Sequence, residues 1–272
     1  MTRSARPRLH WRGTLLYPTA LVAFFLLLQW LAGWLGIAPA QQAALAALPA
    51  VAALVISLPL RVKRCWGMAQ PWQHLGVIAP ASAVARALLR GLLKALALLA
   101  LVLICLHLSG DISWQPRLSG ALVLNALCLG AGVGFAEELL FRGWLMGELS
   151  LWLGEQRGLW LQAVVFSLVH CRFDLPPLLL AGLLLGLLLL GLALGLQRRA
   201  DHNLLWGAVG LHGGLVGGWL ALSAGVIVID PNAPVWLTGP NNPIGGVEGV
   251  VGLALLLLAR HPWWKTSKRR EA

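Results

Sequence analysis

The chain has 272 residues, of which 58% are hydrophobic and only 11% are charged. Soluble domains carry roughly a quarter of charged residues, so this composition excludes an ordinary soluble enzyme and indicates a polytopic membrane protein. The net charge of +11 does not indicate nucleic-acid binding, because the basic residues cluster at the ends of apolar stretches and not on one polar face. The four cysteines are scattered without a C-x-x-C pair, which argues against a disulfide framework or a thiolate metal site.

Apolar stretches of about 20 residues are needed to cross the hydrocarbon core of a bilayer. Eight such stretches predict an all-α, polytopic transmembrane helix bundle of about eight spans. In chain order they are roughly 14–36, 40–60, 86–108, 118–136, 158–173, 176–196, 203–225 and 245–259. The first stretch is longer than the apolar part of a signal peptide, so a retained span is favoured over cleavage near Ala40.

Basic residues set the expected orientation, because cytoplasmic loops carry an excess of lysine and arginine. With the N-terminus inside an eight-span chain, every lysine and arginine except Arg117 and Arg172 falls on the cytoplasmic side. We therefore expect an N-in, C-in multi-pass protein. If its source is bacterial it would lie in the inner membrane, and if cyanobacterial there or in the thylakoid.

A cationic stripe begins the third span. Arg86, Arg90 and Lys94 recur every four residues and therefore share one helix face. We expect these side chains to reach toward lipid phosphates. The alternative is that the stripe lines a site for an anionic group or a carboxylate.

The only adjacent pair of acids, Glu137 and Glu138, lies in an apolar segment. Carboxylates at membrane depth are costly and persist where a partner or a function holds them. Glu138 precedes Arg142 by four residues, the favourable order for an ion pair on a helix, so this pair is expected to be structural. Glu137 lies about 100° further round the helix and has no such partner. It is therefore a candidate general base, with an anchoring role for both acids as the alternative.

Two histidines occur in comparable apolar surroundings. His170 follows Phe166 by one helical turn, and His212 lies in a glycine-rich segment. Either histidine alone could be a hydrogen-bond donor that bridges helices, but two of them with a spare glutamate indicate a site. Small residues at four-residue spacing around His212 also predict close helix packing; these are Gly210, Gly214 and Gly218, and separately Gly213 and Gly217.

One predicted boundary conflicts with a shared site. If the fourth span ends at residue 136, Glu137 lies near the inner face, whereas His170 lies toward the outer face. The two groups can meet only if the span limits are displaced by several residues, or if residues 118–150 form one long or broken helix.

Together these motifs resemble the CPBP family of intramembrane proteases, which includes the CAAX prenyl endopeptidases and the Abi-like bacteriocin-processing enzymes. The resemblance rests on three motifs in order: Glu137-Glu138-x-x-x-Arg142, Phe166-x-x-x-His170 and His212. It covers the predicted catalytic bundle, residues 118–259. The three spans of residues 1–117 carry no recognised motif, and residues 260–272 form a predicted basic cytoplasmic tail. Residues 236–246 resemble the late loop of the cyanobacterial branch.

The resemblance implies an endopeptidase that hydrolyses a peptide bond near the membrane through a water activated by Glu137. His170 would hold and polarise this water, and His212 would face the developing oxyanion. Supporting roles in the site would fall to Glu138, Arg142 and Phe166. The implied substrates are membrane-associated or lipidated peptides and proteins, taken from the cytosolic side, and no cofactor is implied.

Two other functions stay open from the sequence. Two histidines and a glutamate could form a zinc site of the His₂Glu type in a membrane metallopeptidase, although the H-E-x-x-H helix is absent. The family often places an amide or acid four residues after the last histidine, where this chain has Val216. That departure favours a non-catalytic membrane scaffold or chaperone of the same fold. Membrane lipids are expected partners in each case, and the sequence does not specify an oligomeric state.

Overall fold

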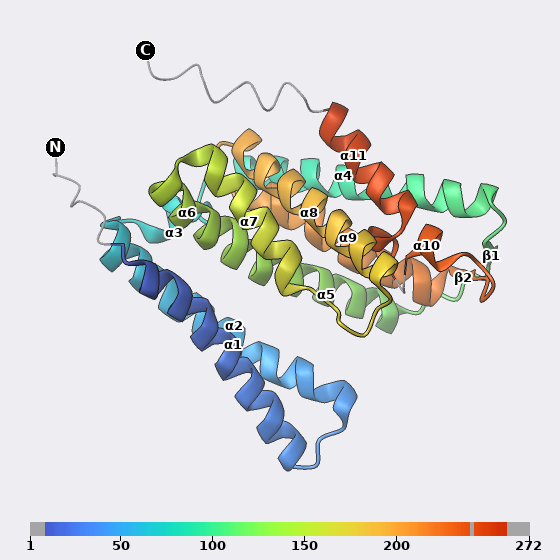
Figure 1. Ribbon diagram of the computed structural model, residues 1–272, viewed down its shortest axis with the longest axis horizontal. Helices are drawn as coiled ribbons and strands as arrows, with labels where there is room; N and C mark the ends of the chain where they lie inside the picture. The colour runs from blue at the N-terminus through green and yellow to red at the C-terminus, as the bar shows by residue number, and fades with distance from the viewer. Residues whose placement is uncertain (1–8, 240–241, 260–272) are drawn as a thin grey trace. The chain divides into compact units, whose positions relative to one another are not determined.

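A computed structural model describes residues 9–239 and 242–259 (Figure 1). The predicted basic tail at 260–272 lies outside these residues, as do two positions of the expected late loop, 240 and 241. The chain divides into two compact units, one up to His74 and one from Leu75 onward. The division at residue 117, which rests on motifs alone, stays a prediction.

The first unit is built on a helical hairpin. Helices α1 (Trp11–Trp34) and α2 (Pro39–Arg61) pack against each other, and a π-helical turn (Val62–Trp66) and the short helix α3 (Pro71–His74) follow. The hydroxyls of Tyr17 and Ser57 lie 3.0 Å apart and join the two long helices. No candidate site residue falls in this unit.

The second unit is a bundle of helices with one short β-ribbon at an end (Figure 1). Its elements up to the middle of the bundle are α4 (Ala81–Leu108), β1 (Ile112–Trp114), α5 (Gly120–Glu138), a π-helical segment (Leu139–Leu145), α6 (Met146–Leu153) and α7 (Glu155–Val169). They are followed by α8 (Pro177–Ala200), α9 (Trp206–Gly225), β2 (Ile227–Ile229), α10 (Val235–Thr238), a 3₁₀ turn (Pro243–Gly245) and α11 (Val247–Ala259). The two strands pair antiparallel with Ile112 opposite Ile229.

The predicted all-helical membrane bundle is confirmed. Within 9–239 and 242–259, six helical stretches are long and apolar enough to cross a membrane. The remaining two predicted spans correspond to α7 and α11, which have 15 and 13 residues. Both are shorter than the roughly 20 residues of a straight crossing. The protein is therefore a multi-pass membrane protein, while the eight crossings and the N-in, C-in orientation stay predictions.

The predicted end of the fourth span at residue 136 is wrong. Helix α5, the π-helical segment and α6 form one apolar stretch, Gly120–Leu153, of 34 residues. Charged residues begin at Glu137, and charges usually mark the end of a span. Here Arg142 Nη1 lies 2.7 Å from Glu138 Oε1, so the two charges neutralise each other inside the helix. Glu137 consequently lies near the middle of a long helical stretch, and the conflict with the position of His170 disappears.

Two residues of the cationic stripe on α4, Arg90 and Lys94, bind protein groups. The Arg90 guanidinium contacts Asp201 Oδ1 at 2.5 Å, and Lys94 donates to the side-chain oxygen of Gln197. Gln197 in turn donates to Asp201 Oδ2 at 2.6 Å. Asp201 is buried at the end of α8, and a buried carboxylate needs a cation or donors to stabilise its charge. Arg90 therefore has the carboxylate partner that the sequence left as the alternative, and Lys94 has an amide partner. For Arg86, which is exposed, lipid contact stays a prediction.

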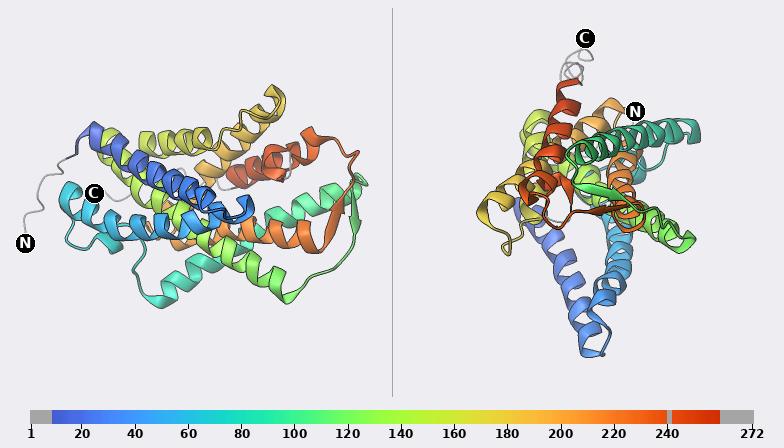
Figure 2. Two further views of the ribbon diagram at one scale, coloured as in Figure 1. Left: turned by 90° about the horizontal axis from the view of Figure 1, so that it is seen from below. Right: turned by 90° about the vertical axis from the view of Figure 1, so that its right-hand side faces the viewer.

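Helix α9 packs against α4, α5 and α8 (Figure 2). His212, which lies on this helix, is buried. The two glycine series of α9 face different neighbours. Gly213 and Gly217 lie against Gly130 and Ala126 of α5, whereas Gly214 lies against Ala95 of α4. The sequence predicted close helix packing at these glycines, and the backbones do approach closely on both faces of α9.

The α5–α9 crossing provides a test with a matched control on one helix. A Cβ atom at Gly134 would lie 2.8 Å from Gly213 Cα, whereas a Cβ at Gly132 would meet nothing within 4 Å. We expect Gly134→Ala to lower the free energy of unfolding by about 1–3 kcal/mol through overpacking. Gly132→Ala should leave it unchanged or raise it by up to about 1 kcal/mol, because alanine favours the helix. Thermal unfolding in detergent measures both, and equal effects would contradict the close crossing.

Candidate active site

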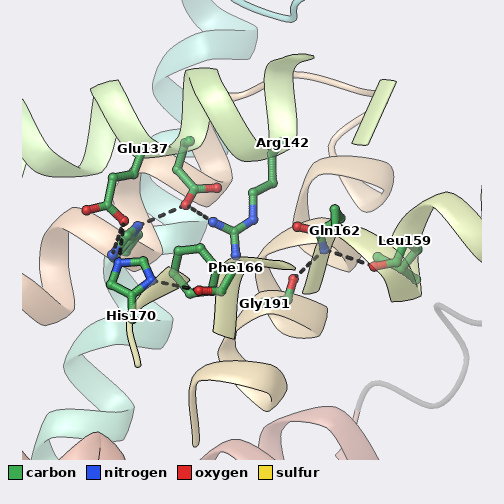
Figure 3. A network of polar contacts seen from close by, with 9 residues as sticks. Glu137, Arg142, Leu159, Gln162, Phe166, His170 and Gly191 are labelled. Atoms are coloured by element: carbon green, nitrogen blue, oxygen red, sulfur yellow. Dashed lines mark hydrogen bonds and ion pairs between the residues drawn. The ribbon is translucent and has the colours of Figure 1, made fainter. Parts of the chain in front are cut away.

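Three helices bring the predicted catalytic residues together. Glu137 lies near the end of α5, His170 follows the last residue of α7, and His212 lies on α9. Glu137 Oε2 is 3.6 Å from His170 Nε2 and 3.9 Å from His212 Nε2. Figure 3 shows the Glu137 carboxylate and the His170 ring facing each other. The site is therefore a cluster of one carboxylate oxygen and two imidazole nitrogens.

Hydrogen bonds on the far side of each ring fix which nitrogen faces Glu137. His170 Nδ1 donates to the Phe166 carbonyl oxygen at 2.7 Å, and His212 Nδ1 donates to Glu138 Oε1 at 2.9 Å. A carbonyl and a carboxylate can only accept, so each ring carries hydrogen on Nδ1. Both Nε2 atoms are thereby directed toward Glu137, in the way that outer partners orient histidines in other catalytic sites.

Glu138 and Arg142 form a fully buried ion pair next to this cluster, on the Nδ1 side of the His212 ring. Arg142 Nη1 donates to Glu138 Oε1 at 2.7 Å, and neither side chain is exposed. The guanidinium also lies 4.1 Å from the centre of the Phe166 ring, a cation–π contact visible in Figure 3. The same carboxylate oxygen accepts from His212, so Glu138 connects α5, the π-helical segment and α9.

Arg198 supports the site in a way that the sequence did not reveal. It is buried, and it donates from Nη1 to the Arg142 carbonyl oxygen and from Nε to the Asn203 carbonyl oxygen. Arg142 lies in a π-helical segment, where the regular hydrogen-bond ladder of an α-helix is interrupted. Arg198 satisfies a carbonyl there. In the sequence it is one of two adjacent arginines at the end of an apolar stretch, which is the pattern of an ordinary cytoplasmic flank.

A cavity of about 340 Å³ opens onto the three catalytic candidates. Its wall is mostly apolar and comes from α4, α8, α9 and α11, with Leu98, Leu99, Leu183, Leu187, Leu215 and Leu253 among the lining residues. Val216 lies on this wall. A site of this kind excludes bulk water around the reacting groups and accepts apolar ligands.

Two polar residues of the wall were not expected from the sequence. Arg172 and Asn242 both line the cavity, although each lies in a loop. Arg172 is exposed and contacts Asp174 Oδ2 at 2.6 Å, and this hydrogen bond holds the pKa of the Asp174 carboxyl below its ordinary value. Only one feature of the sequence indicated a role for Asn242 in the site. It lies in residues 236–246, the segment that resembles a late loop of the family.

The geometry suits a water molecule held among the three groups. Separations of 3.6 and 3.9 Å are too long for direct hydrogen bonds, and polar groups at such distances are often bridged by water. Glu137 Oε2 is buried and accepts no hydrogen bond from the residues that the structure describes, so it can accept one from water. Over the same part of the chain, no group of three His, Cys, Asp or Glu side chains has a geometry that could hold a metal ion.

Comparison with known proteins found one family that matches part of the chain. Residues 119–217 match the model of a family described as Type II CAAX prenyl endopeptidase Rce1-like. The matched segment runs from the start of α5 into α9 and contains Glu137, His170 and His212. No curated protein and no solved structure matches the chain.

The adjacent glutamates are expected to differ in what they contribute to stability. Glu138→Gln removes the charge opposite a fully buried guanidinium, and breaking such a pair costs about 3–5 kcal/mol. Glu137→Gln should change the free energy of unfolding by less than about 1 kcal/mol, because this side chain is 30% exposed and has no cationic partner within hydrogen-bond distance. The two isosteric variants are each other's control in a detergent unfolding experiment. Equal stabilities would show that Glu138 does not hold Arg142.

Proposed function

We propose that this chain, whose residues 119–217 match an Rce1-like CAAX prenyl endopeptidase family, is a peptidase that cleaves peptide bonds near the membrane with a water activated by Glu137. The observation that carries the proposal is the convergence of Glu137 Oε2 with the Nε2 atoms of His170 and His212 on the wall of a mostly apolar cavity. A positioned carboxylate in such a site is suited to general base catalysis.

Each residue has a distinct part in the proposed reaction. Glu137 takes a proton from the water as its oxygen attacks the carbonyl carbon of the scissile bond, and the proton then passes to the departing amine nitrogen. His170 Nε2 accepts the second hydrogen of the water and keeps the water in place. A His212 ring with hydrogen on both nitrogens donates from Nε2 to the oxyanion, while its Nδ1 keeps the hydrogen bond to Glu138 Oε1.

The proposed substrate is a membrane-associated or lipidated peptide. The cavity wall is apolar, and it lies in a multi-pass membrane protein, so an apolar segment or a lipid chain can reach it from the bilayer. The family description, which names prenyl endopeptidases, supports a lipidated segment next to the cleaved bond. The cyanobacterial branch stays a prediction, as does uptake from the cytosolic side.

A non-catalytic scaffold of the same fold is the second candidate. The observation that favours it is Val216, an apolar side chain on the cavity wall at the position where the family often has an amide or acid. A scaffold would keep the cavity and bind the same kind of segment without turnover. Cleavage by the purified protein separates the two functions.

The test is cleavage of a quenched fluorescent, C-terminally lipidated peptide by the detergent-purified protein. We expect Glu137→Gln to lower kcat/KM by about 10²–10⁴-fold, because it removes the general base and leaves the shape of the site intact. A chelator should have no effect.

Gly132→Ala is the control variant, because that position meets no other group within 4 Å. Full activity of Glu137→Gln would rule out the proposed role of Glu137. Loss of activity in the chelator with recovery on adding zinc would instead establish a metallopeptidase.

A further inference from the structure

The cavity holds an amide at a position that sequence order does not suggest. Asn242 lies in the turn between α10 and α11 and lines the same cavity as Glu137 and His212. Val216, one helical turn after His212, lines this cavity too but has no polar side-chain atom. The amide residue on the cavity wall therefore comes from the turn before α11 and not from α9, and it is an exposed residue.

A hydrogen bond within the turn fixes the orientation of the Asn242 amide. Its Oδ1 accepts from the backbone N–H of Ile244 at 3.0 Å. A backbone N–H can only donate, so the atom that faces it is the oxygen, and the two ends of the amide are thereby distinguished. The Nδ2 group makes no hydrogen bond with any residue in the described ranges. Both of its N–H donors are consequently available to a ligand.

Close backbone contacts hold the turn in place. A Cβ atom on Gly182 of α8 would lie 2.5 Å from the Gly245 carbonyl oxygen, and one on Gly245 would lie 3.2 Å from Leu183 Cα. The turn therefore packs directly onto α8, the helix that also supplies Leu183 and Leu187 to the cavity wall. Donors that are held before the reaction begins need little reorganisation when charge develops in the transition state.

We propose that Asn242 Nδ2 donates a hydrogen bond to the oxyanion and so replaces the amide that the chain lacks at Val216. As the water oxygen bonds to the carbonyl carbon, the C=O π electrons move onto the carbonyl oxygen, and Asn242 and His212 donate to it. When the tetrahedral species collapses, the C–N bond breaks and the amine nitrogen takes the proton held by Glu137. The amide itself stays neutral, which suits an apolar wall. This role rests on the proposed peptidase function.

Asn242→Asp is the most direct test, in the same lipidated-peptide assay. Aspartate keeps an oxygen that can accept from Ile244 N–H and so preserves the turn, but it has no N–H to donate. We expect kcat to fall by about 10²–10³-fold while KM and the melting temperature stay unchanged. Asn232→Ala, in the exposed loop after β2, is the control and should keep full activity.

A second-site variant separates a donor role from a structural one. Asn242→Ala removes both the donor and the bond to Ile244, and adding Val216→Asn returns an amide to the cavity without repairing the turn. Recovery of kcat in this double variant supports the donor role, whereas an inactive double variant in a correctly folded protein overturns it. Wild-type activity of Asn242→Asp beside an inactive Glu137→Gln would overturn this inference alone. An active Glu137→Gln would overturn the peptidase mechanism itself.

Discussion

The buried carboxylate of Glu138 is the interaction on which the rest of the site depends. One of its oxygens accepts from both Arg142 and His212, so it ties the long helical stretch that contains α5 to α9. Arg142 in turn lies over the Phe166 ring, and the Phe166 carbonyl oxygen accepts from His170. The orientations of both candidate catalytic histidines thus depend on a single ion pair and its neighbours. In a low-dielectric surrounding such a pair is costly to break, so the arrangement is rigid.

Two adjacent residues of one type have different environments because of helix geometry alone. Consecutive side chains on a helix point about 100° apart, so Glu138 is directed into the bundle and Glu137 toward the cavity. Glu138 has no exposed surface, whereas the Glu137 side chain is 30% exposed. Glu138 Oε1 accepts from two donors, Arg142 and His212, whereas Glu137 Oε2 lies near two histidine rings and accepts no hydrogen bond from the described residues. One carboxylate can therefore stabilise the fold while the other is left for chemistry.

Helix α9 can position His212 because its neighbours approach at backbone distance. In a bilayer no hydrophobic force drives one apolar helix onto another, so close packing of small residues provides the contact. Glycines on two faces of α9 allow α4 and α5 to approach it together. The same principle holds the turn that contains Asn242 against Gly182 of α8. Polar groups that lie far apart in the sequence thereby meet in one small cavity.

The sequence by itself determined the features that depend on composition and local spacing. Apolar length gave the multi-pass helical bundle, four-residue spacing gave the Glu138–Arg142 pair, and glycine spacing gave the close packing of α9. Chain order also indicated the three residues that converge on the cavity.

Only the tertiary structure decided which distant groups meet. Glu137 Oε2 and His170 Nε2 lie 3.6 Å apart because an internally neutralised ion pair lets the helix continue past residue 136. Arg90 contacts Asp201, and Asn242 lines the same cavity as Val216, which has no amide. Local interactions follow from the helical repeat and can be read from spacing, whereas these contacts depend on how helices cross, which no single segment specifies.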